Sequence, residues 1–340
     1  MARERIVSAA EQEQDAEQAT GALRPARIDE YVGQRELIER LRIALEAAKA
    51  RQEPMEHVLL HGPPGLGKTT LAHVIAAEMG TRAYVTSGPA LTKAADLIGT
   101  LTKMQAHDVL FIDEIHRLPT AVEEYLYPAM EDFRIDFTVD SGMHSKVVTI
   151  GLRPFTLIGA TTRAGLLTQA LRSRFGLSHH LDFYGQEELE RILLRAADLL
   201  GVKTDAPSVH TLAARSRGTP RVALRLLRRV RDWAQVKGKG RVDAEAVRAG
   251  LELEGVDASG LDELDRKYLR TLARTYKGGP VGLETLAATI GEDADTLEDL
   301  VEPFLLRSEL LARTRQGRRL TAAGAAIIGE RLEGAELFES

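Results

Sequence analysis

Five short apolar runs recur in the first half of the chain, and helix-length segments separate most of them. A continuous apolar run of four to six residues is typical of a strand that is buried on both faces, as strands of parallel sheets are. The intervening segments are long enough for crossover helices. The pattern therefore predicts an α/β domain built on a parallel sheet. The runs are HVLL (57–60), AYVT (83–86), VLFI (109–112), FTLIGA (155–160) and HHLDF (179–183).

One stretch departs from this pattern because its apolar positions alternate with polar ones. FRIDFTV (133–139) is apolar at every second position, and the alternation resumes from Val148 to Leu152. Strict alternation is typical of strands with one buried face, so we expect an inserted β-hairpin at about 133–153. A hairpin packed on its own domain and an arm that projects towards a partner protein both fit this pattern.

From Gln186 onward the apolar residues recur at helical spacing. Asp295 and Glu298 are spaced as a capping box for the last of these helices, and a turn at 316–317 then separates two short strands, 310–314 and 318–321. Three helices followed by a small hairpin is the order of a winged helix. GVDASG (255–260) is interpreted as a linker before it. The predicted helices lie at 186–200, 206–216, 220–236, 262–276, 283–290 and 296–306.

Charge is segregated along the chain, so the formal net charge of −5 conceals basic segments. Residues 1–22 carry a net charge of −3, whereas 213–241 carry +9 and 307–319 carry +4. Local basic segments indicate partners more directly than the total charge does. Part of 213–241 is an amphipathic helix, which favours a solvated face or an ion-pairing surface between subunits over a DNA site.

Composition excludes several classes of site. The chain has no cysteine, which excludes disulfides and thiolate metal sites and fits a reducing cytoplasm. No apolar run approaches the roughly 20 residues that cross a bilayer, and no signal segment opens the sequence. We therefore expect a cytoplasmic protein with no membrane partner. Aromatic residues make up only 5% of the chain, so a base-stacking platform is not expected.

GPPGLGKT (62–69) matches the phosphate-binding pattern G-x-x-x-x-G-K-[ST], between a predicted strand and a predicted helix. Its backbone N–H groups and the helix N-terminus favour a bound phosphate. Lys68 is expected to reach the β- and γ-phosphates, Thr69 to ligate Mg²⁺, and Thr70 to lie near the α-phosphate. An ordinary glycine-rich turn would not need all eight positions to match. The predicted loop contacts are Gly62, Gly65, Gly67, Lys68, Thr69 and Thr70.

LFIDEIH (110–116) places two carboxylates directly after an apolar strand. Ligands of open parallel sheets bind at this carboxyl end of the strands. Asp113 is expected to hold the Mg²⁺ shell, and Glu114 to orient and deprotonate the attacking water. A pair of surface carboxylates is the alternative, which the neighbouring phosphate loop disfavours.

Three further residues are candidates for nucleotide contacts only because the chain also contains this phosphate loop. Thr162 ends the strand in LIGATTR (157–163), where its hydroxyl could contact the γ-phosphate or the water. Arg174 in SRFG and Arg221 in RGTPRVAL could each reach phosphates. Taken singly, a threonine at a strand end is usually a cap or a satisfied polar group, and neither arginine would indicate a phosphate contact by itself.

The motifs GPPGLGKTT, LFIDEIHRL, YPAMED, LIGATTR, SRFG and RGTPRVA, in this order and spacing, resemble those of AAA+ ATPases. More narrowly, the chain resembles the RuvB family of Holliday-junction branch-migration motors from about Leu23 to Leu332. Many AAA+ proteins share the nucleotide motifs. The combination of YPAMED with the 133–153 hairpin and VGLETLAATIGED (281–293) is narrower.

The resemblance implies roles that the patterns leave open. Thr162 resembles the first sensor and Arg221 the second sensor. Arg174 resembles an arginine finger, which acts on ATP bound by a neighbouring subunit. Further residues resemble those that line the nucleotide, namely Leu23, Arg24, Tyr31, Tyr184, Glu131, Asp132 and Phe133.

The resemblance also implies an organisation in domains. The expected parts are an acidic, disordered tail (1–22), a large AAA+ ATPase domain (23–183), a small helical AAA+ domain (184–254), a winged-helix domain (255–332) and a tail (333–340).

Partners follow from the same resemblance. It implies a hexameric ring on DNA, powered by ATP with Mg²⁺ in recombination and repair, loaded by RuvA through the hairpin and joined by the resolvase RuvC. The hairpin tip, SGMHSK (141–146), departs from the Gly/Pro/Ala-rich turn of the family and leaves individual RuvA contacts open. A clamp-loader subunit is the alternative enzyme, which the winged helix disfavours. An ATP-switched initiator or regulator is the alternative binding protein, which Glu114 and Arg174 disfavour.

The DNA contacts are predicted on the hairpin of the winged helix. Its third helix carries three acidic residues, Glu298, Asp299 and Glu302, and such a face repels phosphates. A motor that moves along any sequence needs backbone contacts rather than base contacts. We therefore expect phosphate contacts from the basic hairpin LLARTRQGRRLT (310–321). The candidates are Arg313 and Arg318, then Arg315 and Arg319.

Overall fold

The computed structural model describes residues 21, 23–139 and 146–330. The expected tail 333–340, the tip of the hairpin and nearly all of the tail 1–22 therefore lie outside the described residues. Two compact units are present: one ends at Gly62 and resumes from Gly67 to Asp182, and the other comprises 63–66 and the chain from Phe183 onward. Within the described ranges, no helix has the length and apolar character needed to cross a membrane.

The first unit is built on a five-stranded sheet in the order β2-β3-β6-β1-β7, and every neighbouring pair is parallel. Each of the five predicted runs forms one of these strands. The last strand lies earlier than predicted, because HHLDF leaves the sheet after His180. The strands are β1 (Val58–His61), β2 (Ala83–Ser87), β3 (Val109–Asp113), β6 (Thr156–Thr161) and β7 (Leu177–His180).

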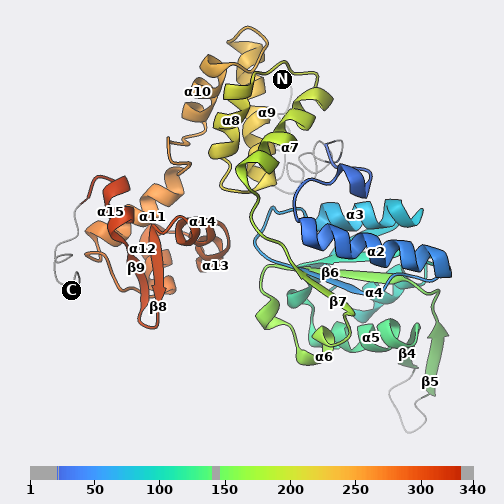
Figure 1. Ribbon diagram of the computed structural model, residues 1–340. Helices are drawn as coiled ribbons and strands as arrows, with labels where there is room; N and C mark the ends of the chain where they lie inside the picture. The colour runs from blue at the N-terminus through green and yellow to red at the C-terminus, as the bar shows by residue number, and fades with distance from the viewer. Residues whose placement is uncertain (1–20, 22, 140–145, 331–340) are drawn as a thin grey trace, which may run out of the picture. The chain divides into compact units, whose positions relative to one another are not determined.

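Helices cover both faces of this sheet (Figure 1). α2 (Arg35–Arg51) and α3 (Lys68–Met79) lie on one face, and α4 (Ala94–Leu101), α5 (Thr120–Glu131) and α6 (Gln169–Arg172) lie on the other. The parallel sheet with two covered faces is therefore confirmed. Short 3₁₀ turns connect these elements at Ile28–Glu30, Gly88–Ala90, Ile115–Arg117 and Ala164–Leu166.

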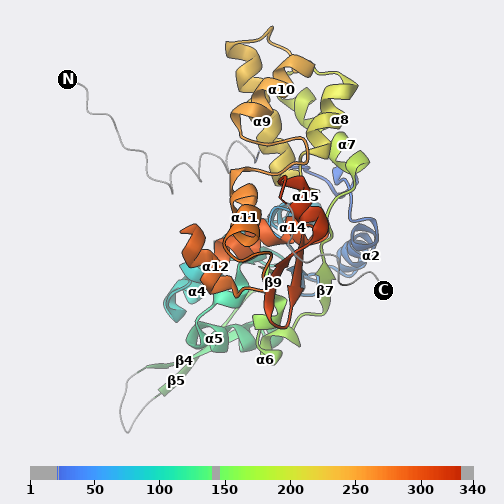
Figure 2. The ribbon, with the colours of Figure 1, turned by 90° about the vertical axis from the view of Figure 1, so that its left-hand side faces the viewer.

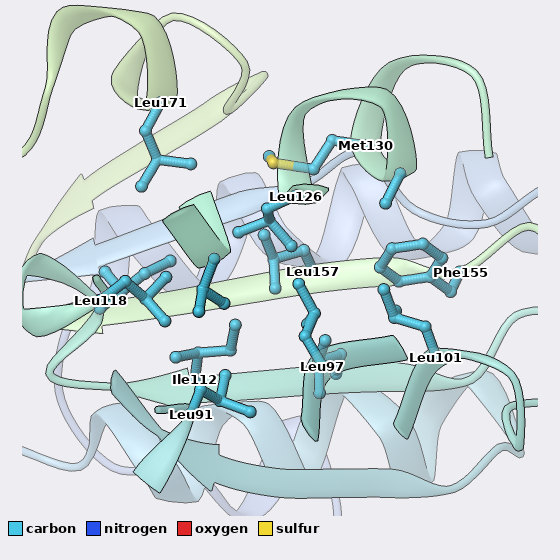
Figure 3. Packing of buried hydrophobic residues seen from close by; sticks show 14 of the residues in the cluster. Leu91, Leu97, Leu101, Ile112, Leu118, Leu126, Met130, Phe155, Leu157 and Leu171 are labelled. Atoms are coloured by element: carbon cyan, nitrogen blue, oxygen red, sulfur yellow. The ribbon is translucent and has the colours of Figure 1, made fainter. Parts of the chain in front are cut away.

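The core beneath α4, α5 and α6 explains why the strands are apolar throughout. Ile112 and Leu157 of adjacent strands meet Leu97 and Leu126 of the helices in one cluster (Figure 3). Successive side chains of a strand point to opposite faces. Phe111, the neighbour of Ile112, therefore packs on the other face and is also fully buried.

The predicted hairpin is present as β4 (Arg134–Val139) and β5 (Lys146–Gly151), which pair antiparallel in a sheet of their own. Its base packs on its own unit, since Ile135 is fully buried in the core beside α5. Phe133 precedes β4 with a φ of +49°, and its carbonyl accepts the Leu152 N–H at 2.6 Å at the base of the hairpin.

The second unit begins with four helices. Spacing predicted three of them, but not the fourth, α10, whose interior contains Gly250. A Cβ at this glycine would lie 2.7 Å from Val230, so glycine permits the close approach of α10 to α9. The helices are α7 (Gln186–Leu199), α8 (Ala206–Ala214), α9 (Pro220–Val236) and α10 (Ala244–Leu253).

A winged helix follows in the same unit. The predicted third helix is wrong in detail: it begins earlier, so that Asp295 is a helical residue rather than a cap, and it contains a π-helical turn. Pro303 lacks an N–H and its ring crowds the preceding turn, which explains the wider turn before it. The elements are α11 (Glu263–Arg274), α12 (Leu283–Ile290), α13 (Ala294–Thr296), the π turn Leu297–Val301, α14 (Glu302–Arg307), β8 (Leu311–Thr314), β9 (Gly317–Leu320) and α15 (Ala322–Ile327).

The segment interpreted as a linker, 255–260, is a hydrogen-bonded turn. Arg217 of the helical part donates through Nε to the Gly260 carbonyl (2.9 Å) and pairs with Asp262 and Asp265, each at 2.6 Å. Burial raises the pKa of the Asp265 carboxyl to about 7, against the opposing charge of Arg217. This arginine therefore fastens the four helices to the winged helix.

Candidate nucleotide site and winged-helix surface

The phosphate loop joins β1 to α3, and its three glycines adopt positive φ. The angles are +135° at Gly62, +76° at Gly65 and +99° at Gly67, a region that side chains strain to enter. A Cβ at Gly62 would also lie 2.6 Å from the Leu181 carbonyl. Because Gly67 caps α3 without a side chain, no capping group covers the first N–H groups of the helix. They are suited to bind phosphate oxygens.

Lys68 is the first residue of α3 and is 7% exposed. Its Nζ donates to the Gly62 carbonyl at 2.9 Å, so the ammonium group lies back over the loop. Thr69 and Thr70 follow in the first turn and are half-buried. The sequence thus places all of its predicted phosphate contacts on one continuous strand–loop–helix segment.

The two carboxylates after β3 lie at the same edge of the sheet as this loop, because β3, β6 and β1 are adjacent and parallel. Asp113 ends β3, and its Oδ1 accepts the Glu114 N–H at 2.9 Å. Glu114 has a φ of +48°, and its Oε2 lies 3.4 Å from Nδ1 of His116. That nitrogen is also 2.8 Å from the Thr161 hydroxyl of β6. The histidine thus links Glu114 to the end of β6, directly before Thr162.

Thr162 follows β6 at this edge. Its hydroxyl is buried and makes no hydrogen bond with any described residue. A buried hydroxyl without a partner costs about 1–3 kcal/mol. A hydroxyl left in this state beside a phosphate loop is suited to bind an oxygen of a ligand or a water.

The residues at this edge fit a magnesium ion that arrives with a nucleotide. Mg²⁺ takes one or two protein oxygens and completes its shell with phosphates and water. The Thr69 hydroxyl and the Asp113 carboxylate supply oxygens of this kind. No group of three or more His, Cys, Asp or Glu side chains within the described residues could hold a metal by itself. The donor set therefore matches a nucleotide-dependent ion better than a permanent metal site.

Arg174 lies at the opposite, amino-terminal edge of the sheet. His57 immediately precedes β1, and its Nε2 is 3.0 Å from the Met130 carbonyl, which places the end of α5 at that edge. Nε of Arg174, shortly before β7, is 3.1 Å from Oε1 of Glu131. The four residues of β1 span roughly 13 Å. The structure therefore does not bring Arg174 to the phosphate loop of its own chain.

The segment Glu131–Phe133, which the resemblance assigned to the nucleotide, lies at this same amino-terminal edge. The ring of Phe133 meets that of His57 edge-on, with centroids 6.4 Å apart. Asp132 is exposed beside it and pairs with Arg134 at 3.2 Å. These residues accompany Arg174 rather than Lys68.

The tip of the phosphate loop, residues 63–66, belongs to the second unit together with Tyr184 and Arg221. The hydroxyl of Tyr184 donates to the Leu66 carbonyl at 3.1 Å, and the Arg221 N–H donates to the Gly65 carbonyl at 3.3 Å. Arg221 stands in the first turn of α9, as the sequence predicted. Tyr184 and Arg221 are therefore brought to the loop that the sequence assigned to phosphate.

The remaining predicted nucleotide contacts belong to the segment before α2. Leu23 is buried, and Arg24 and Tyr31 are half-buried. Three residues after Tyr31, the Gln34 side chain makes two hydrogen bonds with the backbone of Asp182, at 2.6 and 3.1 Å. Asp182 lies just beyond the carboxyl end of β7. Gln34, three residues after Tyr31, is therefore held at the edge of the sheet that carries the phosphate loop.

In the winged helix, two of the four predicted DNA contacts are ion-paired. The Glu302 carboxylate is fully buried and accepts hydrogen bonds from Nε of Arg313 (2.8 Å), Nε of Arg318 (2.9 Å) and the Tyr268 hydroxyl (2.8 Å). Glu298 lies 3.3 and 3.4 Å from the same two arginines.

The other two arginines of this hairpin differ. Arg315 and Arg319 are exposed, as Arg313 is, but neither pairs with a carboxylate in the part of the chain that the structure describes. The order of preference predicted among the four arginines therefore places the two ion-paired arginines ahead of the two without a carboxylate partner.

Comparison with known families covers almost all of these elements. Residues 23–181 match the Holliday junction DNA helicase RuvB P-loop domain, 184–257 the RuvB AAA lid domain, and 258–329 the RuvB C-terminal winged helix domain. The chain belongs to the RuvB family.

Individual relatives agree with this assignment. The Holliday junction branch migration complex subunit RuvB of Desulfosudis oleivorans is 54% identical over 95% of this chain and 94% of its own length. The subunit of the same name from Myxococcus xanthus is 55% identical over 88% of each chain. The structure of the Thermotoga maritima RuvB Holliday junction branch migration motor is 49% identical, with a TM-score of 0.84 over 92% of this chain and all of that one.

Sequence reasoning missed three features of this RuvB-family site. It did not find the stack of Arg174 on Tyr127, whose ring centroid is 4.2 Å from the guanidinium carbon. It took Glu302 for part of a repelling surface, and it gave His116 no role. The YPAMED motif was a signal for the first feature, because it contains both Tyr127 and Glu131. No local signal marks a glutamate as buried.

Proposed function

We propose that this chain is an ATP-driven motor that moves the branch point of Holliday junctions during recombination and repair. The observation that carries the proposal is the separation of the phosphate loop and Arg174 at opposite edges of one sheet, in a chain of the RuvB family. If Arg174 takes part in hydrolysis, it must therefore act on ATP bound by a second subunit, and a ring of subunits provides such a neighbour. We infer a homo-hexamer around duplex DNA.

ATP hydrolysis is assigned to the carboxyl edge of the sheet. The loop N–H groups and Lys68 bind the phosphates, and Glu114 orients and deprotonates the attacking water. The Thr162 hydroxyl contacts the γ-phosphate or that water. Thr69 and Asp113 would hold Mg²⁺, which neutralises charge on the phosphates when bound. Arg221 and Tyr184 bind near the loop tip.

Arg174 serves the nucleotide of the neighbouring subunit. An arginine supplied in trans raises turnover about 10³–10⁵-fold in well-studied nucleotide hydrolases. Because the guanidinium is roughly a strand length away from its own phosphate loop, hydrolysis depends on ring assembly. Glu131, Asp132 and Phe133 accompany it at that shared site.

Movement is transmitted through the second unit. The hydrogen bonds from Tyr184 and Arg221 reach the tip of the phosphate loop, so a change in the loop on hydrolysis alters the contacts of α9. Arg217 fastens the same helical part to the winged helix. We propose that the nucleotide state thereby sets the position of the DNA-binding hairpin.

The partners are assigned to two surfaces. The hairpin at 133–153 is the proposed contact for RuvA, and RuvC joins the resolving complex. Phe137 and Val148 pair across the hairpin and stay half-exposed, which leaves apolar surface for a partner. DNA is bound through its phosphates by Arg313, Arg315, Arg318 and Arg319.

The test is strand displacement from a synthetic four-way junction with RuvA, ATP and Mg²⁺. We expect displacement by the wild-type chain and none by Lys68→Ala, because the phosphates lose their buried ammonium partner. Junctions of unrelated sequence should be processed at similar rates. Displacement by Lys68→Ala, or none by the wild-type chain despite ATP hydrolysis, would contradict the proposed function.

A further inference from the structure

The Arg174 guanidinium is held on three sides within its own subunit. Nε lies 3.1 Å from Oε1 of Glu131, and Nη1 donates to the Ala170 carbonyl at 2.6 Å. The Tyr127 ring covers one face, with its centroid 4.2 Å from the guanidinium carbon. Only 22% of the side chain is exposed. Nη2, by contrast, makes no hydrogen bond with a described residue.

Tyr127 is itself fixed by its neighbours. Its hydroxyl donates to Oε1 of the buried Glu123 at 2.5 Å, and burial together with this contact raises the pKa of the phenol. The same carboxylate oxygen accepts from the hydroxyl of Thr168, which also caps α6 at the Leu171 N–H. Glu123 therefore joins α5 to the start of the short helix that leads to Arg174.

An arginine side chain that is not held by its neighbours loses much rotational freedom when it binds a phosphate. Ordering it before the phosphate arrives moves that cost from the catalytic step to folding. The ion pair with Glu131 fixes the Nε side of the guanidinium, the hydrogen bond to Ala170 uses Nη1, and Tyr127 covers one face; Nη2 is left for an external oxygen. In this arrangement one terminal nitrogen of the guanidinium remains available to a phosphate of the neighbouring subunit. An arginine with both terminal nitrogens hydrogen-bonded inside its own subunit could not bind that phosphate.

We propose that Tyr127 and Glu131, both in the YPAMED motif, are positioning residues for Arg174. They hold the guanidinium in the orientation that meets the nucleotide of the neighbouring subunit. The proposal rests on the proposed function, in which Arg174 acts in trans. It predicts that substitution of either residue slows hydrolysis of the ATP bound by the neighbouring subunit. Binding of ATP to the phosphate loop of the substituted subunit should not change.

The first measurement is steady-state ATP hydrolysis by rings assembled on DNA. Tyr127→Leu removes the stacked ring, and Glu131→Gln removes the charge at nearly constant size. We expect each to lower kcat by roughly 10- to 100-fold, because a small misplacement of a catalytic group has effects of this size. The affinity of unassembled subunits for a fluorescent ATP analogue should stay within about twofold, because Lys68 and the loop of their own site are untouched.

Two variants separate positioning from general damage to α5. Tyr127→Phe keeps the ring and should recover most of the kcat lost in Tyr127→Leu, since the stack depends on the aromatic face. Glu124→Gln, at an exposed position of the same helix, changes the same charge and should hydrolyse ATP at the wild-type rate. Equal losses in Glu124→Gln and Glu131→Gln would overturn the proposal.

The deciding experiment mixes subunits. Lys68→Ala subunits lack ATP but keep an intact arginine, so mixing them with Tyr127→Leu subunits should raise turnover several-fold above the sum of the two alone. Mixing Lys68→Ala with Arg174→Ala is the reference. If only the reference mixture recovers, Tyr127 does not act through Arg174 and the proposal is wrong. If neither mixture recovers at any ratio, the trans role of Arg174 fails, and the positioning role fails with it.

Discussion

At the scale of single residues, the most informative group is the hydroxyl of Thr162. It is buried at the carboxyl edge of the sheet and has no hydrogen-bond partner among the described residues. Thr161, one residue earlier, has a hydroxyl bound both to His116 and to the Arg163 N–H. The two adjacent threonines therefore have different roles: the first completes the fold, and the second is available to a ligand.

This difference predicts a separation of stability from activity. Thr162→Val keeps the side-chain shape and removes only a hydroxyl that contributes no internal hydrogen bond, so the free energy of unfolding should change by less than about 1 kcal/mol. ATP turnover should fall by roughly 10²-fold, the size of effect seen when one polar contact to a transition state is removed. Thermal unfolding and steady-state hydrolysis measure the two. A large loss of stability with normal turnover would show that the hydroxyl is structural.

Arg174 shows the limit of local patterns at this scale. The resemblance identified the residue, but its stack on Tyr127 joins positions 47 residues apart in sequence. Its ion pair with Glu131 joins positions 43 apart. Such contacts depend on how α5 and the segment before β7 pack, which apolar spacing does not specify.

At the scale of elements, the winged-helix hairpin is held by its own third helix. Two of the three acidic residues expected to repel DNA, Glu298 and Glu302, instead pair with Arg313 of β8 and Arg318 of β9. The Glu302 side chain is fully buried. A buried carboxylate is tolerated because several donors satisfy it. Burial alone would lower the pKa of Arg318, but its bonds to Glu302 raise it above the ordinary value.

Glu302 is therefore predicted to stabilise the domain more than its acidic neighbours do. Glu302→Ala removes the buried acceptor that two guanidinium groups and the Tyr268 hydroxyl share, and should cost about 3–5 kcal/mol of unfolding free energy. Glu298→Ala, at a side chain 31% exposed, is the matched control and should cost at most about 1 kcal/mol. Chemical denaturation compares the two. Equal midpoints would show that the buried carboxylate does not hold the hairpin.

Helix α10, which the sequence pattern did not predict, and the segment 255–260, which it predicted as a linker, differ from the prediction for the same reason. Gly250 lies inside α10, where glycine usually weakens a helix, and only the close packing against Val230 explains it. The turn at 255–260 has the composition of a flexible linker but is fixed by Arg217 and by Arg266, which donates to the Gly255 carbonyl at 2.9 Å. In both cases a contact from another element overrides the local preference.

At the scale of the whole molecule, charge must be counted after ion pairing. Arg313 and Arg318 share two carboxylates, whereas Arg315 and Arg319 carry charge that no described carboxylate offsets. If all four arginines each neutralised a phosphate, the slope of log affinity against log salt would be about −3.6 per hairpin. The internal pairs imply that Arg315 and Arg319, which have no described carboxylate partner, provide most of the counterion release.

The corresponding prediction is a change in that slope. Arg315→Ala and Arg319→Ala should each flatten it by about 0.9, equally on duplexes of unrelated sequence, because a phosphate contact carries no base information. Arg318→Ala should flatten it less, since its charge is already paired. Fluorescence anisotropy between 50 and 200 mM salt provides the measurement. A loss that depends on the DNA sequence would contradict binding through phosphates.

The sequence by itself determined the five strands, the phosphate loop and the carboxylates after β3, because each of these is a continuous segment with a pattern of its own. It also determined the winged-helix order, and its family resemblance identified Arg174. The tertiary structure decided which groups share an edge of the sheet, and so separated Arg174 from its own phosphate loop. It also decided which charges are buried, and so bound Arg313 and Arg318 of the basic hairpin 310–321 to Glu302. The physical reason is the same for both: the edge a residue occupies and the partner its charge finds depend on how distant elements pack, which no local pattern records.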